Sequence, residues 1–245
     1  MFLIPKQLNF VFLTPNNKMP QTRIEEIVAL MRGKSVAKQQ AYTATLEVMN
    51  EFKKVMKGYE QNLNLQIQGL NKNIEVKYTD IGDFEAHIKF SGDTLVFMMH
   101  TNIFDFESTH AINKTKYVQA DPLREYCGLI QVYNFLSDSL KYNRGGDMGT
   151  LVGRIFVNRE KHFFMDGHRP FSFLYNDFEQ LEMNEMYVNT ILEDAMLHSL
   201  KLDLIAPPFE MFNIITVEQK NFNSYTSGFN TPRLGFYASF HGDNE

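Results

Sequence analysis

The side chains best suited to chemistry lie in one stretch of the sequence, Asp121 to Tyr175, where arginine, aspartate, asparagine and histidine alternate with aliphatic and aromatic residues. Alternation of this kind is typical of strands that pack one face and expose the other. Two sets of residues within the stretch are candidates for a functional site. The first, a candidate ligand or anion site, comprises Arg124, Asp138, Arg144, Asp147 and Arg154. The second, a candidate metal site, comprises Glu160, His162, Asp166 and His168.

The first set surrounds a glycine-rich loop at residues 145–149. Such a loop can expose backbone amides that hold an anion, yet it matches neither of the phosphate-binding patterns GxxxxGK[ST] and GxGxxG. Arginine and aspartate residues that lie close in sequence also form salt bridges that only fasten a loop. We therefore predict that most of these charged side chains pair with one another, and an anion site remains the alternative.

The second set offers imidazole and carboxylate groups, which are common ligands of zinc and similar divalent ions. On an extended segment, residues at every second position share a face. All four residues stand at even-numbered positions, so an extended segment would place their side chains on one face. Against this, the AspGly pair at 166–167 predicts a hairpin turn that breaks the shared face. The spacing also matches no established metal motif. A surface hairpin with polar tips is the preferred interpretation, and no cofactor is expected.

The sequence holds no GxSxG, HExxH or CxxC motif. It therefore identifies no nucleophile elbow, zinc protease site or paired-cysteine site. Its single cysteine, Cys127, lies in an apolar run and is expected to be a buried, inert thiol. One cysteine excludes an intramolecular disulfide, which fits a reducing compartment. We expect a cytoplasmic protein.

The composition of the whole chain excludes several classes of protein. With 245 residues, 44% of them hydrophobic and 22% charged, the chain is long and apolar enough for a globular core. We predict a single α+β domain over residues 1–245, with a possible subdivision near 107–120. With a net charge of −5, the chain as a whole lacks the excess of basic residues that nucleic-acid binding requires. No apolar run approaches the ~18 residues of a spanning helix, so membrane insertion is not expected.

Helical patterns dominate the first part of the chain. Thr22 and Glu25 form a capping-box pattern before a first helix that is expected to end at Gly33. A longer helix is predicted from Ser35 to about Asn62, because its apolar residues recur at spacings of three and four. A second capping-box pattern, at Asn176, predicts a helix that runs to about residue 202.

Strand patterns occupy most of the remaining sequence and come in runs. Alternation or continuous apolar character predicts strands at 8–13, 74–78, 84–90, 95–100, 128–136, 150–157, 162–165, 209–217 and 234–240. A polar loop is expected at 221–232. Because helices do not alternate one by one with strands, the fold class is α+β. We expect mainly antiparallel sheet, with a long N-terminal helix region and one helix after the central strands.

The leading hypothesis for function is a non-catalytic intracellular binding protein, a structural or interaction subunit of a larger assembly. The chain has 22 phenylalanines and 13 methionines but no tryptophan, which favours a large, adaptable apolar interior or an apolar contact surface. A protein partner or a homo-oligomer is therefore expected. The alternatives are a metal-dependent hydrolase and a small-ligand sensor, each using the 121–175 region.

Overall fold

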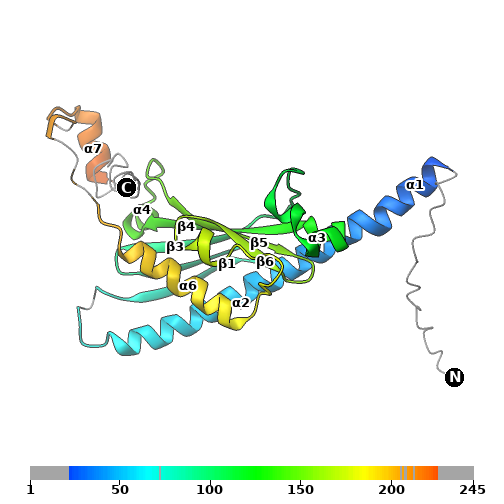
Figure 1. The fold of residues 1–245 in the computed structure, drawn as a ribbon. Helices are drawn as coiled ribbons and strands as arrows, with labels where there is room; N and C mark the ends of the chain where they lie inside the picture. The colour runs from blue at the N-terminus through cyan, green and yellow to red at the C-terminus, as the bar shows by residue number, and fades with distance from the viewer. Residues whose placement is uncertain (1–21, 72, 205, 207–208, 212, 226–245) are drawn as a thin grey trace, which may run out of the picture. The chain divides into compact units, whose positions relative to one another are not determined.

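The computed structural model describes residues 22–71, 73–204, 206, 209–211 and 213–225 (Figure 1). Contacts divide the chain into two compact units, Met1–Val36 and Ala37–Glu245. The subdivision considered near 107–120 therefore falls inside the second unit. The strands predicted at 8–13 and 234–240 lie outside the described residues.

The first unit contains α1 (Arg23–Leu30), which begins at the predicted capping box. The Glu25 backbone N–H donates to Thr22 Oγ1 at 3.2 Å, and the Thr22 N–H donates to the Glu25 carboxylate at 3.1 Å. The predicted end at Gly33 was wrong: Met31–Ser35 form a π-helical turn, η1, and α2 (Val36–Gln66) follows. Glycine inside a helix costs only about 1 kcal/mol relative to alanine, and the Val36 N–H still bonds to the Met31 carbonyl.

The second unit is built on a six-stranded antiparallel sheet in the order β1-β2-β3-β4-β5-β6. Its strands are β1 (Val76–Gly82), β2 (Glu85–Phe90), β3 (Asp93–Met99), β4 (Cys127–Leu136), β5 (Thr150–Asn158) and β6 (Phe163–Gly167). The predicted α+β class, with mainly antiparallel sheet, is confirmed. Five apolar residues of β4 and β5 are buried, namely Leu129, Ile130, Val132, Ile155 and Phe156.

One face of the sheet, the inner face, carries the main core. Figure 1 shows α2 and α6 (Glu185–Leu200) on the same side of the sheet, and side chains of both helices join this core, as does the short α5 (Phe171–Leu174). Phe52 of α2 packs against Phe97 of β3 with ring centroids 5.0 Å apart. Gly128 of β4 lets α2 approach closely, because a Cβ atom there would lie 2.1 Å from Thr45 Oγ1.

Described residues cover the outer face of the sheet towards the Cys127 end of β4. Three short helical segments supply this cover: η2 (Ala111–Lys114), α3 (Lys116–Ala120) and η3 (Pro122–Glu125). Ile112 and Val118 join a second apolar cluster with Leu129, Phe156 and Phe164 of the sheet. Beyond this cluster, β4 continues to its other end, where α4 (Ser137–Lys141) begins. The two ends of β4 therefore lie in different surroundings.

The helix predicted to begin at Asn176 begins instead at Glu185, with Asn184 as its N-cap. Residues before it are held beside β6 by tertiary hydrogen bonds, from Phe163 N–H to the Leu181 carbonyl at 2.9 Å and from Met183 N–H to the Lys161 carbonyl at 2.8 Å. This pairing outweighs the local capping signal.

The strand predicted at 209–217 was also wrong. The chain there forms η4 (Phe209–Met211), and α7 (Val217–Tyr225) then extends into the segment expected to be a polar loop. Thr216 and Gln219 make reciprocal hydrogen bonds of 3.1 and 2.8 Å. Their spacing is a capping-box signal that the sequence reading missed.

Candidate functional site

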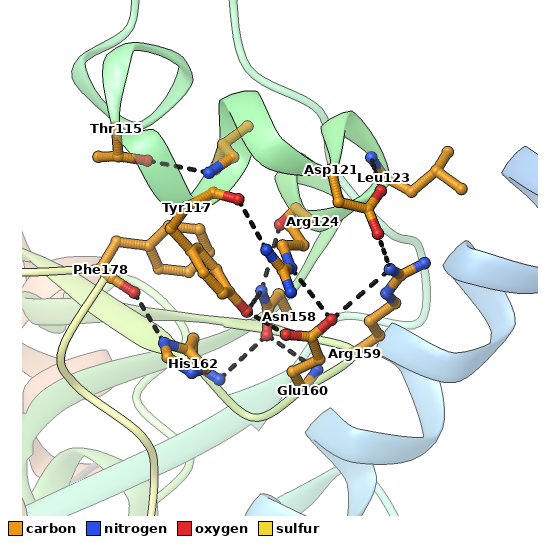
Figure 2. A network of polar contacts seen from close by, with 11 residues as sticks. Thr115, Tyr117, Asp121, Leu123, Arg124, Asn158, Arg159, Glu160, His162 and Phe178 are labelled. Atoms are coloured by element: carbon orange, nitrogen blue, oxygen red, sulfur yellow. Dashed lines mark hydrogen bonds and ion pairs between the residues drawn. The ribbon is translucent and has the colours of Figure 1, made fainter. Parts of the chain in front are cut away.

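Asn158, the last residue of β5, is fully buried at the Cys127 end of β4 and organises the polar network of Figure 2. Its amide nitrogen donates to Tyr117 Oη at 3.0 Å and to the Arg124 carbonyl at 3.3 Å. Its amide oxygen accepts from the backbone N–H groups of Glu160 at 2.9 Å and His162 at 3.0 Å. One side chain thus fixes both the β5–β6 turn and the helical segments above it.

Glu160 is the acidic centre of the same network. Its carboxylate accepts hydrogen bonds from Tyr117 Oη at 2.8 Å and Arg124 Nε at 3.1 Å. Burial alone would raise the pKa of Glu160, but these bonds and the positive charges of Arg124 and Arg159 outweigh it and hold the pKa below its ordinary value. The group therefore stays ionised and paired, which suits a structural role.

The remaining members of the network are also engaged. Arg159 forms an ion pair with Asp121 and lies 3.6 Å from the Glu160 carboxylate. The His162 ring stacks on the Tyr117 ring, with centroids 4.3 Å apart, and its Nδ1 lies 3.1 Å from the Phe178 carbonyl oxygen. We call this set the Asn158 network; it comprises Tyr117, Asp121, Arg124, Asn158, Arg159, Glu160 and His162.

The four candidate metal ligands are distributed over three places. Glu160 and His162 belong to the Asn158 network, Asp166 pairs with Arg154, and the His168 ring stacks on His198 with centroids 6.0 Å apart. In the part of the chain that the structure describes, no group of three or more histidine, cysteine, aspartate or glutamate side chains is arranged to hold a metal ion.

The hairpin turn predicted at the AspGly pair was wrong, because both residues belong to β6 and Gly167 pairs with Gly153 of β5. A Cβ atom on Gly167 would lie 2.6 Å from the Val152 carbonyl oxygen, so glycine is needed there for a close strand approach. The strands turn earlier, before β6, where Lys161 has a left-handed φ of 63°.

The candidate anion set is also divided. Arg124 pairs with Glu160, and Arg154 pairs with Asp166 through two hydrogen bonds, one of them 2.9 Å from Nε to Oδ1. Both acidic partners, Glu160 and Asp166, belong to the candidate metal set, so the structure joins residues of two sets that were predicted to be separate sites. The Arg154–Asp166 pair follows from the β5–β6 register, in which the two residues face each other. The Arg124–Glu160 pair has no comparable local signal.

Arg144 and its two acidic neighbours lie at the Leu136 end of β4. Arg144 Nη1 is 3.5 Å from the Asp147 carboxylate, and Nη2 is 3.9 Å from the Asp138 carboxylate. Asp147 also accepts a 2.5 Å hydrogen bond from Ser139 Oγ. This end of the sheet holds a cavity of about 1020 Å³, which we call the Arg144 cavity. Its charged lining residues are Glu75, Lys77, Lys89, Asp138, Lys141 and Arg144.

An exposed apolar patch lies on α5 and α6. The two helices are in contact through the Phe171 and His198 rings, with centroids 6.0 Å apart, and through a 2.8 Å hydrogen bond from Tyr175 Oη to Asp194. Large apolar side chains on both helices are more than half exposed; this α5–α6 patch comprises Phe173, Leu174, Leu197 and Leu200. The phenylalanine and methionine content favoured either an apolar interior or an apolar contact surface, and it did not indicate where such a surface would lie.

None of the described helices is both long enough and apolar enough to cross a membrane. Comparison with family models, with curated proteins and with solved structures found no protein that matches this chain.

Proposed function

We propose that the chain is a non-catalytic binding protein that acts as a subunit of a larger assembly, and that the α5–α6 patch is its contact surface. The observation that carries this proposal is the exposure of Phe173, at 71%, and of three leucines on the adjoining helices α5 and α6. Exposed large apolar side chains are costly in water, and where they are contiguous they commonly mark a protein interface. A cytoplasmic location is part of the same proposal, because the chain has one cysteine and Cys127 is fully buried.

The partner we propose is a second copy of the chain. Glu193 and Leu197 are exposed on α6, and its C-cap residue Lys201 is exposed as well, so Leu197 lies midway in sequence between an acidic and a basic residue. If two α6 helices pack antiparallel about Leu197, Glu193 of each copy lies beside Lys201 of the other. A two-fold interface requires such self-complementarity. Charge pairing around an apolar centre is the usual arrangement of an interface.

Light scattering after gel filtration, over a range of protein concentrations, tests this interface. We expect the wild type to dimerise and Leu197→Glu to be monomeric. Leu65→Glu is the matched control, because Leu65 is 71% exposed on α2 and plays no part in the proposed contact. Lys201→Glu should weaken the dimer, and adding Glu193→Lys should restore it. A monomeric wild type, or equal weakening by both leucine substitutions, contradicts the proposal.

A second candidate function, a small-ligand sensor, is favoured by one observation. The Arg144 cavity, at about 1020 Å³, is large enough for a small molecule and brings four basic side chains together. This function is independent of self-association, since the cavity and the α5–α6 patch share no residue.

A further inference from the structure

We propose that the Arg144 cavity binds a small molecule that carries at least two anionic groups, phosphate or carboxylate. The inference rests on the second candidate function, the sensor, and does not depend on assembly through the α5–α6 patch. Four basic residues line the cavity, Lys77, Lys89, Lys141 and Arg144, against two acidic residues, Glu75 and Asp138. The chain as a whole has a net charge of −5, so this positive excess is local. A concave site lined by one sign of charge concentrates ligands of the opposite sign.

One wall of the cavity places two lysines against each other. Lys77 of β1 and Lys89 of β2 are direct cross-strand partners, so their side chains leave the same face of the sheet. Like charges in this position destabilise a sheet. Lys89 forms a 2.9 Å ion pair with Glu75, whereas Lys77 interacts with the same carboxylate only through coulombic attraction and forms no hydrogen bond or ion pair with the described residues. An anion bound beside both lysines would relieve their repulsion.

Arg144, another residue that lines the cavity, has spare hydrogen-bonding capacity. The Arg144 side chain is only 12% exposed, and its carboxylate contacts, at 3.5 and 3.9 Å, are longer than the ~2.8 Å of a strong charge-assisted hydrogen bond. Its Nε is buried and has no hydrogen-bond partner among the described residues. Since buried donors are rarely left unsatisfied, this atom calls for a partner, and a bound anion would supply one.

Part of the cavity lining is held in place by hydrogen bonds. The turn residues Ser91 and Gly92 line the cavity, and Ser91 has a left-handed φ of 57°. The Ser137 N–H donates to the Gly92 carbonyl at 2.7 Å, and Ser137 Oγ lies 2.9 Å from Thr94 Oγ1. These bonds tie the β2–β3 turn to the end of β4. This part of the lining is therefore positioned before a ligand arrives, which lowers the entropic cost of binding.

The ligand class follows from size and lining. Small-molecule sites usually measure about 300–1,000 Å³, and the volume of about 1020 Å³ accommodates a molecule of nucleotide size. Six of the fourteen lining residues carry a charge, so an anion with several charged groups is a better match than an apolar ligand. A long nucleic acid would need an extended basic surface, and the acidic chain disfavours it.

Isothermal titration calorimetry with two probes tests the proposal: pyrophosphate for a phosphate ligand and citrate for a carboxylate ligand. The chains to compare are the wild type, Lys77→Gln, Lys141→Gln and the control Lys54→Gln. Lys54 is a matched control because it lies on α2, its side chain is 68% exposed, and it does not line the cavity. We expect saturable binding to the wild type and to Lys54→Gln, weakened about tenfold by each cavity substitution.

The result with each probe has a defined meaning. Saturable binding of one probe alone assigns the ligand to phosphate or to carboxylate chemistry, and binding of both assigns it to the shared anionic chemistry. The absence of saturable binding of either probe, or equal affinity for all four chains, overturns the site. Light scattering of the same samples shows whether self-association has changed, so failure of this site and failure of the proposed assembly are distinguishable.

Discussion

The two ends of β4 use the same kinds of charged side chain in different ways. With ten residues at ~3.3 Å each, β4 separates its ends by about 30 Å. At the Cys127 end, Asn158 and Glu160 each make several hydrogen bonds within the Asn158 network. At the Leu136 end, the side chains of Asn134, Arg144 and Asp147 supply three of the five buried polar atoms that lack a hydrogen-bond partner in the described part of the chain.

This difference separates a structural cluster from a candidate binding site more clearly than charge does. Arginine–carboxylate pairs occur at both ends, so their presence decides nothing. What differs is the state of the central side chains: Asn158 and the Glu160 carboxylate are satisfied within the Asn158 network, whereas the buried Arg144 Nε has no hydrogen-bond partner among the described residues. A fully satisfied network rigidifies a fold, whereas unsatisfied buried groups are energetically costly unless another molecule completes them. The Asn158 network is therefore expected to govern stability, and the Arg144 cavity to govern ligand response.

The largest expected effect is from Asn158→Ala. The substitution removes four hydrogen bonds and leaves the partly buried N–H groups of Glu160 and His162 without their acceptor. We expect the free energy of unfolding to fall by about 3 kcal/mol, measured by urea denaturation. Asn73→Ala is the matched control at the cavity end, where the exposed asparagine should contribute less than about 0.5 kcal/mol. Equal losses for the two substitutions would remove the distinction between the ends.

The next largest expected effect is the loss, at acid pH, of the contribution that Glu160 makes to stability. Its pKa is lower in the folded chain than the ordinary 4.5, so its contribution to stability is present above pH 4.5 and is lost as the pH falls through the folded pKa. The side chain is 36% exposed, so solvent screening limits the contribution to about 1 kcal/mol or less. Urea denaturation should therefore show Glu160→Gln less stable than the wild type at pH 7, with a difference that shrinks as the pH falls below 4.5. A difference that does not shrink on acidification contradicts this origin.

The effect of Asp93, at the cavity end, on stability is expected to change with pH in the opposite direction. Burial raises its pKa above the ordinary 3.8, although a hydrogen bond from Asn134, 3.0 Å long, partly offsets this. A raised carboxyl pKa favours folding at low pH, and the advantage is lost as the pH rises through the folded pKa. Asp93→Asn should therefore stabilise the chain at pH 7, by an amount on the order of 1 kcal/mol or less. Thermal melts at pH 7 and pH 3 measure this, and a destabilised variant at pH 7 would count against it.

The smallest expected effect on stability is from Lys77→Gln. Without added anion, removal of the repulsion between Lys77 and Lys89 should leave the free energy of unfolding unchanged or raise it by up to about 0.5 kcal/mol. Thermal melts with pyrophosphate should then show a smaller stabilisation for the variant than for the wild type, because a ligand that binds the folded state stabilises it. A clear loss of stability without anion would assign Lys77 a structural role.

Much of the sheet was predictable because its signals are local. Alternating side chains placed five of the six strands close to their observed bounds, including β4 and β5. The segment after Tyr175 was not predictable, since its hydrogen bonds to β6 come from tertiary pairing. The candidate sites were harder to predict than the strands, because their residues are far apart in the sequence. Arg124 and Glu160 lie 36 residues apart, and the meeting of Lys77 with Arg144 across one cavity depends on how four separate segments are arranged.

The distinction between the two ends is tested most directly by mapping backbone amide chemical shifts of the isotope-labelled wild type during a titration with pyrophosphate. We predict saturable shifts at residues 74–77, 89–92 and 136–144, which line or adjoin the Arg144 cavity. Amides at residues 158–162, in the Asn158 network, should not move. Shifts of equal size at both ends, shifts confined to 158–162, or no saturable shift would contradict the account.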